Sequence, residues 1–433
     1  MERLSILCLC APLTAALLHA ASANTLEKTP ETRVQEIRTD SARRCTASIV
    51  SQERLSVTGG HEIYVEPVTL AAVGGDVLLA GSPAFLWDTT KTDDARRQQN
   101  RRILGVVIHH DGHNTIVPSP IDAKLILGIR AVGIQNNTWA VVFAESKPWV
   151  GSTPPDTADR VWFGVYNGSR WSTLEQIPLP HGVRVHPLRG SGLVRQGDTL
   201  FWAVRTTTEA RASEVVVFRR EGARWFSDTV PTRDATDLAL AYSGSLGAVL
   251  AVVQPDTSVT EDNGSLYLYA RQARWMALRR VVSGEKDATY APTLRFTRTH
   301  GVLSWSALTQ TRSRVRRESR AATLDAAAQP QSRFTVDPQI LDVSIPVESS
   351  GSTHLWITDH AGGDGTRQEL RFVAGFDAVT STVGVLPNPY AGYFGAVSAL
   401  PGHVIIAGPI IDRTQRRVLS LVIRARVVCG ALH

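Results

Sequence analysis

The sequence predicts an all-β protein, a seven-bladed β-propeller, and three observations lead to that prediction. Short apolar segments recur about every fifty residues, and turns followed by an aromatic residue recur at a similar spacing. Between these markers no long stretch shows helical periodicity with capping residues. Four short strands per repeat, without helices, is the pattern of a propeller.

Seven apolar segments mark one buried strand in each repeat. Their first residues lie 62, 61, 48, 54, 52 and 50 positions apart. Near-continuous apolarity indicates burial on both faces of a strand. The segments are Val77–Ala80, Trp139–Val142, Leu200–Ala203, Ala248–Ala251, Val302–Trp305, His354–Ile357 and Val404–Ala407. They place the blades near residues 61–118, 125–178, 188–232, 236–283, 290–336, 339–386 and 391–428.

A second marker predicts a hairpin between the outer strands of four repeats. Each copy follows a β-prone run and ends on an aromatic residue, and we expect that residue to open the next strand and to occupy one shared packing position. The copies end at Trp171, Trp225, Trp275 and Phe334, with spacings of 54, 50 and 59.

The last repeat is short, which predicts that the N-terminal part of the chain completes it. We expect the closing strand to run from residues 47–50 through 55–57 and to protect an edge that would otherwise be open. Cys45 lies beside this strand and Cys429 ends the last repeat. In an exported protein two cysteines favour one disulfide, and two free thiols are the alternative.

The N-terminus predicts export. An uncharged run from Leu4 to Leu18 precedes Ala21-Ser22-Ala23, which has the small residues of a signal-peptide cleavage site. We therefore expect a signal peptide at 1–23, a flexible leader at 24–42 and a single propeller domain at 43–433, located in the periplasm or secreted. No later segment is long and apolar enough to predict a transmembrane helix, and we expect a monomer.

The composition is that of a globular protein with a small positive charge. The chain is 43% hydrophobic and 20% charged, and 46 basic against 40 acidic residues give +6. No phosphate loop, zinc spacing or nucleic-acid motif is present, so we expect no cofactor, no metal and no nucleic-acid partner.

The hairpin markers resemble the Asp-box of the sialidase-like propeller superfamily, whose motif is Ser-x-Asp-x-Gly-x-x-Trp. Only its end survives here, as Gly168-x-x-Trp171 and Gly222-x-x-Trp225, and Tyr166 stands where the Asp belongs. The resemblance implies the fold. It does not imply sialidase activity, because the family's first Arg would precede Pro67 and Glu66 occupies that place.

Three aspartates predict a ligand site where the blades join. In a propeller the blade-joining connections and the loops between second and third strands share one face, near which ligands bind. Asp122, Asp234 and Asp287 each fall in such a connection, and they could bind a cation or sugar hydroxyls at the axis. The alternative is that each Asp hydrogen-bonds its own turn.

Arginines and one tryptophan fall in loops of the same face. Arg97 and Arg101 lie in blade 1, and Arg312 and Arg316 lie in blade 5. Such clusters suit an anionic glycan or an envelope protein, and solvated hairpins are the alternative. Trp149 could stack on a sugar ring or merely anchor its loop.

A histidine-rich segment, His109-His110-Asp111-Gly112-His113, is interpreted as a polar hairpin. Neighbouring strand residues point to opposite faces, so His109 and His110 should not share one metal ion.

The sequence thus favours a binding module for a glycan or an envelope protein, acting through its loop face. The alternative is a carbohydrate-active hydrolase or lyase of sialidase-like fold with non-standard catalytic residues. Such a hydrolase needs two carboxyl groups about 5–9.5 Å apart.

Overall fold

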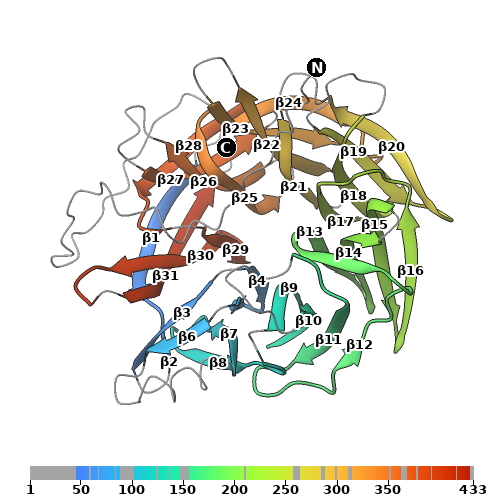
Figure 1. Cartoon of the computed structure of the whole chain (residues 1–433). Helices are drawn as coiled ribbons and strands as arrows, with labels where there is room; N and C mark the ends of the chain where they lie inside the picture. Colours follow the sequence, from blue (N-terminus) through green and yellow to red (C-terminus); the bar gives the residue numbers. More distant parts are fainter. Residues whose placement is uncertain are drawn as a thin grey trace, which may run out of the picture.

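The computed structural model of the chain describes most of residues 45–429. The described ranges are 45–57, 60–66, 68–82, 84–87, 102–122, 125–135, 137–146, 156–208, 211–256, 264–283, 288–297, 300–310, 315–350, 353–361, 368–376, 379–391, 393–415 and 417–429. The expected signal peptide and leader lie outside these ranges. Within them the chain forms strands and no α-helix (Figure 1).

Seven four-stranded antiparallel sheets form the blades, which confirms the predicted propeller (Figure 1). Blade 1 is β4 (Thr69–Val73), β5 (Asp76–Ala80), β7 (Ile103–Ile108) and β8 (Asn114–Pro118). Blade 2 is β9 (Ile126–Gln135), β10 (Thr138–Glu145), β11 (Arg160–Tyr166) and β12 (Glu175–Gln176). Blade 3 is β13 (Arg184–Gln196), β14 (Thr199–Thr208), β15 (Arg211–Glu221) and β16 (Arg224–Val230).

The remaining blades follow the same order. Blade 4 is β17 (Asp237–Ser243), β18 (Gly247–Gln254), β19 (Ser265–Arg271) and β20 (Trp275–Val282). Blade 5 is β21 (Ala288–Phe296), β22 (Gly301–Gln310), β23 (Val315–Leu324) and β24 (Pro330–Asp337). Blade 6 is β25 (Ile340–Ser350), β26 (Thr353–Ala361), β27 (Gln368–Phe376) and β28 (Val379–Pro387). Blade 7 is β29 (Gly395–Leu400), β30 (His403–Asp412), β31 (Arg417–Cys429) and β1 (Cys45–Arg54).

The first strand of each blade lies at the axis of the ring. These strands contact one another in the order β4, β9, β13, β17, β21, β25 and β29, and β29 contacts β4 again. Figure 1 looks along this axis. All seven predicted apolar segments lie in second strands. Each second strand lies between the first and third strands of its blade, which explains why its side chains are buried.

The core consists of apolar clusters between neighbouring blades. One cluster of described residues lies at each of the seven junctions. The junction of blades 5 and 6 has a small apolar cluster around Trp356. Buried polar side chains accompany it, among them Ser319, Asp337 and Thr358. Packing between flat blades therefore holds most of the ring together, and hydrogen bonds between blades add to it, as where Trp139 Nε1 of blade 2 donates to the Ala71 carbonyl of blade 1.

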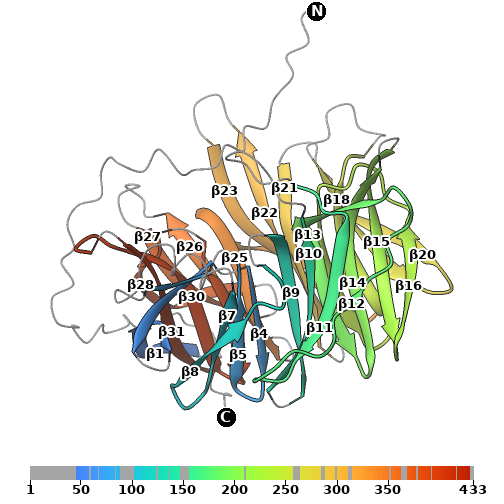
Figure 2. The ribbon, with the colours of Figure 1, turned by 60° about the horizontal axis from the view of Figure 1, so that its bottom comes forward.

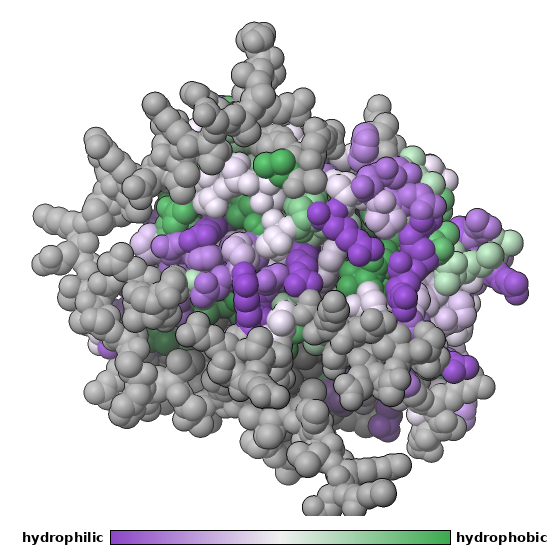
Figure 3. Space-filling model, turned by 90° about the horizontal axis from the view of Figure 1, so that it is seen from above, coloured by the Kyte–Doolittle hydropathy of each residue, from purple (hydrophilic) through white to green (hydrophobic). Residues whose placement is uncertain are grey.

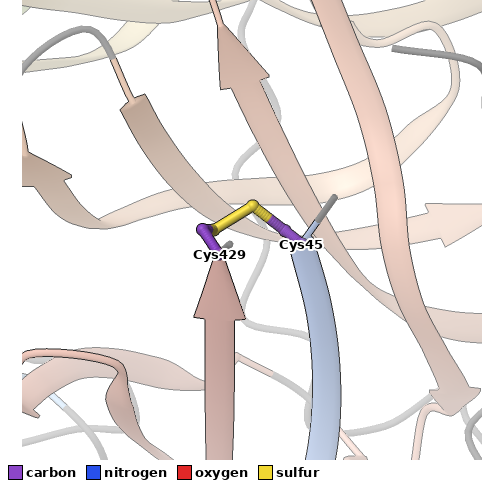
Figure 4. The surroundings of a disulfide bond; sticks show 2 residues. All are labelled: Cys45 and Cys429. Atoms are coloured by element: carbon purple, nitrogen blue, oxygen red, sulfur yellow. A yellow bond between two sulfur atoms is a disulfide. The ribbon is translucent and has the colours of Figure 1, made fainter. Parts of the chain in front are cut away.

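The N-terminal strand closes the ring as predicted. β1 pairs antiparallel with β31, and Cys45 lies directly opposite Cys429. A disulfide joins these two residues (Figure 4). The closing strand is shorter than predicted, because it ends at Arg54.

A small sheet that the sequence analysis missed lies between blades 7 and 1. β2 (Ser56–Val57), β3 (His61–Val65) and β6 (Ala84–Trp87) pair in the order β2-β3-β6. The Ser420 hydroxyl on β31 donates to the Val65 carbonyl at 3.1 Å and accepts from its amide at 2.8 Å. Two expectations are corrected: residues 56–57 leave the closing strand, and blade 1 begins at Thr69 rather than near residue 61.

Three of the four aromatic markers pack toward the preceding blade, and Phe334 does not. Trp171 belongs to the cluster between blades 1 and 2, Trp225 to that between blades 2 and 3, and Trp275 to that between blades 3 and 4. Trp225 packs on Phe163 of the preceding blade, whereas Phe334 packs on Trp356 of the following blade. In blade 5 the hairpin turn precedes β24 and Phe334 lies inside that strand, so the side chain faces the other way. Trp171 forms only an isolated bridge with Tyr166 before β12.

Candidate functional site

The propeller has two unlike faces. The loop face carries the connections between blades and the loops between second and third strands, and it is uppermost in Figure 2. The hairpins between third and fourth strands lie on the opposite face, together with the disulfide. Of the candidate ligand residues predicted from the sequence, the structure describes Asp122, Asp234 and Arg316, and all three belong to the loop face.

The predicted aspartates are only partly described. Asp122 and Asp234 lie exposed in the connections that follow blades 1 and 3, and Asp287 lies outside the described residues. Asp234 has a φ of 48°, a left-handed backbone conformation that suits a turn. The structure thus places two of the three on the expected face, and their role in binding stays a prediction.

Most of the predicted arginines and the predicted tryptophan cannot be placed. Arg97, Arg101, Arg312 and Trp149 lie outside the described residues. Arg316 begins the third strand of blade 5, where its Nε donates to the Pro338 carbonyl at 3.1 Å and pairs with Glu318 at 3.1 Å. Its side chain therefore stabilises the connection to blade 6.

A pair of residues that the sequence analysis missed lies near the axis in blade 3. His186 on β13 is directly paired with Arg205 on β14, so both side chains leave the same side of the sheet. Arg205 Nη1 donates to the Ala235 carbonyl in the connection to blade 4, at 3.1 Å. This contact directs the guanidinium toward the loop face beside the axis.

A second pair spans the axis-facing strands of blades 2 and 4. Arg130 on β9 donates to the Ile129 and Ser191 carbonyls at 2.7 and 3.0 Å. The carboxylate of Asp237, the first residue of β17, accepts from the Ala291 amide at 2.8 Å and interacts with the Arg130 guanidinium. We call Arg130, His186, Arg205 and Asp237 the axial cluster.

The electrostatics of the axial cluster are positive. Burial, and next the positive charge of Arg205, lower the pKa of His186, with Asp156 acting in the opposite direction. The imidazole is therefore neutral at pH 7. Burial also lowers the pKa of Arg130, against the effect of Asp237, but a guanidinium stays charged at physiological pH. The cluster thus carries two guanidinium cations, the Asp237 carboxylate and one neutral imidazole.

Tyr64 and Glu66, in the segment matched to the sialidase Arg-Ile-Pro, are half-buried. Burial raises the pKa of Glu66, and burial together with the charge of Glu66 raises the pKa of Tyr64. The Glu66 backbone contacts Gly81 so closely that a Cβ there would lie 1.5 Å from the Glu66 carbonyl oxygen. Glu66 is therefore held rigidly where the connection enters blade 1.

The histidine-rich segment lies on the opposite face and forms the predicted hairpin, in which the Gly112 amide donates to the His109 carbonyl at 3.1 Å. His109 Nδ1 and His110 Nδ1 bond the two oxygens of the Asp76 carboxylate, at 2.9 and 3.0 Å. Both rings reach this carboxylate because β7 ends at Ile108, so strand alternation does not apply to them. Burial would raise the pKa of Asp76, but the hydrogen bonds from His110 and His109 lower it overall.

Figure 3 views the rim of the ring that lies at the top of Figure 1, where hydrophilic side chains cover much of the described surface. Within the described ranges, no three His, Cys, Asp or Glu side chains are placed to hold a metal ion. The described part of the chain also has no helix of the length and apolarity needed to cross a membrane.

Comparison with known proteins finds similar solved structures but no similar sequence. No protein-family model and no curated protein matches the chain. Among solved structures it is similar to an ulvan lyase of polysaccharide lyase family PL25, with a TM-score of 0.53, 9% identity, and coverage of 85% of this chain and 95% of that chain. The same lyase bound to -[GlcA(1-4)Rha3S]- matches with a TM-score of 0.53 and 10% identity over the same shares of both chains.

A weaker likeness is to an α-L-arabinofuranosidase from Fusarium graminearum. Its TM-score is 0.46 at 10% identity, over 70% of this chain and 93% of that chain. The chain is therefore a propeller with carbohydrate-active enzymes among its structural neighbours. The narrower resemblance to the sialidase-like class stays a prediction.

Proposed function

We propose that this chain is an exported propeller that binds an acidic glycan at its loop face, with the axial cluster as the site that recognises the anionic group. The observation that carries the proposal is the pairing of His186 with Arg205, whose Nη1 is held by the Ala235 carbonyl on the loop face. Burial lowers the pKa of His186 most, and the positive charge of Arg205 lowers it further. A carboxylate or sulfate ester placed there would be attracted.

The chemistry of the cluster suits such a ligand. Guanidinium groups bind carboxylates and sulfates through two parallel hydrogen bonds, and their planar geometry adds specificity. Arg205 uses Nη1 on the Ala235 carbonyl, which fixes its orientation before a ligand arrives. The neutral imidazole of His186 can accept a hydrogen bond from a sugar hydroxyl.

Two further observations support the ligand class and the compartment. The ulvan lyase neighbour is bound to a disaccharide that contains glucuronate and a sulfated rhamnose, so acidic glycans are the class to test first. The Cys45–Cys429 disulfide suits an oxidising compartment, as the predicted signal peptide does.

The test is calorimetric titration with glucuronate-containing and neutral polysaccharides. We expect the wild type to bind the acidic polymer, and Arg205→Gln to weaken binding about 10- to 100-fold, because a charged hydrogen bond is worth about 1.5–3 kcal/mol. Arg170→Gln is the matched control, since Arg170 is exposed in a hairpin turn of the opposite face.

Three outcomes would overturn the proposal. They are equal affinity of both variants, equal binding of neutral and acidic polymers, and binding of an envelope protein without any glycan. A melting curve of each variant verifies folding, and Arg205→Lys retains the charge if Arg205→Gln fails to fold.

A second candidate is a lyase acting on the same glycan, and His186 favours it. A neutral imidazole could take the proton next to a uronate carboxylate while Arg205 balances the carboxylate charge. The electron pair would form a carbon–carbon double bond, and the glycosidic oxygen would leave and take up a proton. Ultraviolet absorbance of an unsaturated uronate, absent in His186→Gln, would support this candidate. Unchanged chain length after long incubation would exclude it.

A further inference from the structure

The connection between blades 6 and 7 carries an aromatic residue that the axial cluster does not use. Two of its residues, Tyr390 and Phe394, are buried and stack with ring centroids 5.6 Å apart. Tyr390 donates its hydroxyl hydrogen to the Ile406 carbonyl at 3.2 Å, and the Ala391 amide donates to the Pro409 carbonyl at 2.8 Å. These contacts fasten the connection to β30 on both sides of the intervening residues.

Tyr393 lies between these anchors and points outward. Its side chain is 60% exposed, whereas the next residue, Phe394, is 4% exposed. Exposing a large aromatic ring gains nothing for the core, and tyrosine is enriched at interfaces because it joins an apolar ring to a polar hydroxyl. The buried Tyr390 and Phe394 flank the exposed ring on either side in the chain.

The position of Tyr393 relates it to the axis. It lies two residues before Gly395, the first residue of the axial strand β29. A Cβ at Gly395 would lie 2.2 Å from Leu70 Cδ1, so β29 packs tightly on blade 1. Figure 1 shows β29 across the axis from β13, the strand that carries His186. The exposed ring and the axial cluster thus belong to opposite sides of the same face.

We propose that Tyr393 is a stacking platform for a second sugar of the ligand, so that the loop face binds an oligosaccharide laid across the axis rather than a single sugar. The proposal rests on the glycan-binding function above. It adds that the bound glycan is an oligosaccharide of at least two sugars. The apolar face of a pyranose ring packs on an aromatic ring, while an anionic group elsewhere on the chain meets Arg205. The two contacts act on linked sugars, so their effects on affinity should combine.

The test compares a disaccharide with longer oligosaccharides from one glucuronate-containing polysaccharide. We expect Tyr393→Ala to weaken binding of the longer chains about tenfold and to leave the disaccharide unchanged, while Tyr393→Phe binds as the wild type does. Arg205→Gln should weaken both ligands. Phe226→Ala is the matched control, because Phe226 is 42% exposed on the outer strand β16, away from the axis.

The failure of this inference is distinguishable from failure of the proposed function. If the wild type binds the oligosaccharides and depends on Arg205, but Tyr393→Ala changes no affinity, only the platform is wrong. If the wild type binds no acidic oligosaccharide, the proposed function is wrong and the platform with it. If the wild type binds a protein partner instead of a glycan, and this binding is lost in Tyr393→Ala, the stacking platform for a sugar is also wrong. Because the ring is exposed, Tyr393→Ala should melt at the wild-type temperature, which verifies its folding.

Discussion

His186 and Arg205 are directly paired across β13 and β14, and the guanidinium helps to keep the imidazole neutral. An anion that bridges both side chains would reverse this effect, because it stabilises the protonated imidazole. Binding of an acidic ligand should therefore take up a proton, and its affinity should rise as the pH falls toward the lowered pKa of His186. Protonation of His186 and binding of the proposed acidic ligand should therefore be coupled.

The same pair predicts how stability depends on pH. Since the pKa of His186 is lower in the folded than in the unfolded chain, the unfolded chain binds the proton more readily as the pH falls below about 6.5. The free energy of unfolding should therefore decrease on acidification, and His186→Gln should lose part of that decrease. Urea unfolding at about pH 7.5 and pH 5.5 measures both. The exposed His181 provides the control variant, and a wild-type slope in His186→Gln would argue against the assignment.

The disulfide predicts a large effect of reduction on stability. Cys45 and Cys429 are 384 residues apart in the chain, so the bond restricts the unfolded state strongly. The chain-entropy model gives on the order of 5 kcal/mol for such a loop, before any opposing effect in the folded state. We expect no free thiol in the mature protein, from which Cys8 and Cys10 are removed with the predicted signal peptide, and a lower melting temperature after reduction or in Cys45→Ser. Two titratable thiols in that mature protein would refute the covalent closure.

Asp337 predicts a weak point at the junction of blades 5 and 6. It is 1% exposed, and its carboxylate accepts from Thr358 Oγ1 at 2.7 Å, from His360 Nδ1 at 2.8 Å and from the Gln339 amide at 3.0 Å. Asp337→Ala leaves these buried donors unpaired, so we expect a loss of about 3 kcal/mol or more in urea unfolding.

Asp198→Ala is the matched control for this variant, because its carboxylate is fully exposed and forms only a 3.7 Å ion pair with Arg195. It should change stability by less than about 0.5 kcal/mol. Similar costs for the two variants would show that the buried hydrogen bonds do not hold the junction.

Gly81 predicts a steric requirement beside Glu66. A Cβ at Gly81 would collide with the Glu66 carbonyl oxygen, whereas a Cβ at Gly244 would meet nothing within 4 Å. We expect Gly81→Ala to lose several kcal/mol or fail to accumulate as folded protein, and Gly244→Ala to remain within about 0.5 kcal/mol of the wild type. Thermal melts of the two variants provide the comparison. Equal melting temperatures would mean that blade 1 can move away from the connection.

The sequence predicted the blades because each second strand is buried on both sides and is therefore apolar throughout, as Val77–Ala80 and Trp139–Val142 are. It did not predict the sheet of β2, β3 and β6, since that pairing depends on Ser420 and other residues far along the chain. Phe334 was misplaced because the turn before β24 is longer than in blades 3 and 4, and one shift in register reverses the face.

The site was harder to predict than the fold. Asp234 was predicted because it lies in a connection between blades, but the carboxylate that interacts with Arg130 belongs to Asp237, three residues later. Its signal was an acidic residue at the first position of an otherwise apolar axial strand. The pairing of His186 with Arg205 depends on the register of β13 and β14, which includes an irregularity between His186 and Ser191. Tyr393 was recognisable only once its neighbours were seen to be buried.

The most direct test of the account is a crystal structure of the protein soaked with a glucuronate-containing oligosaccharide. We expect density for a carboxylate within hydrogen-bonding distance of the Arg205 guanidinium, on the loop face and near the axis. An oligosaccharide bound only on the rim or the opposite face, with Arg205 free of ligand, would contradict the account.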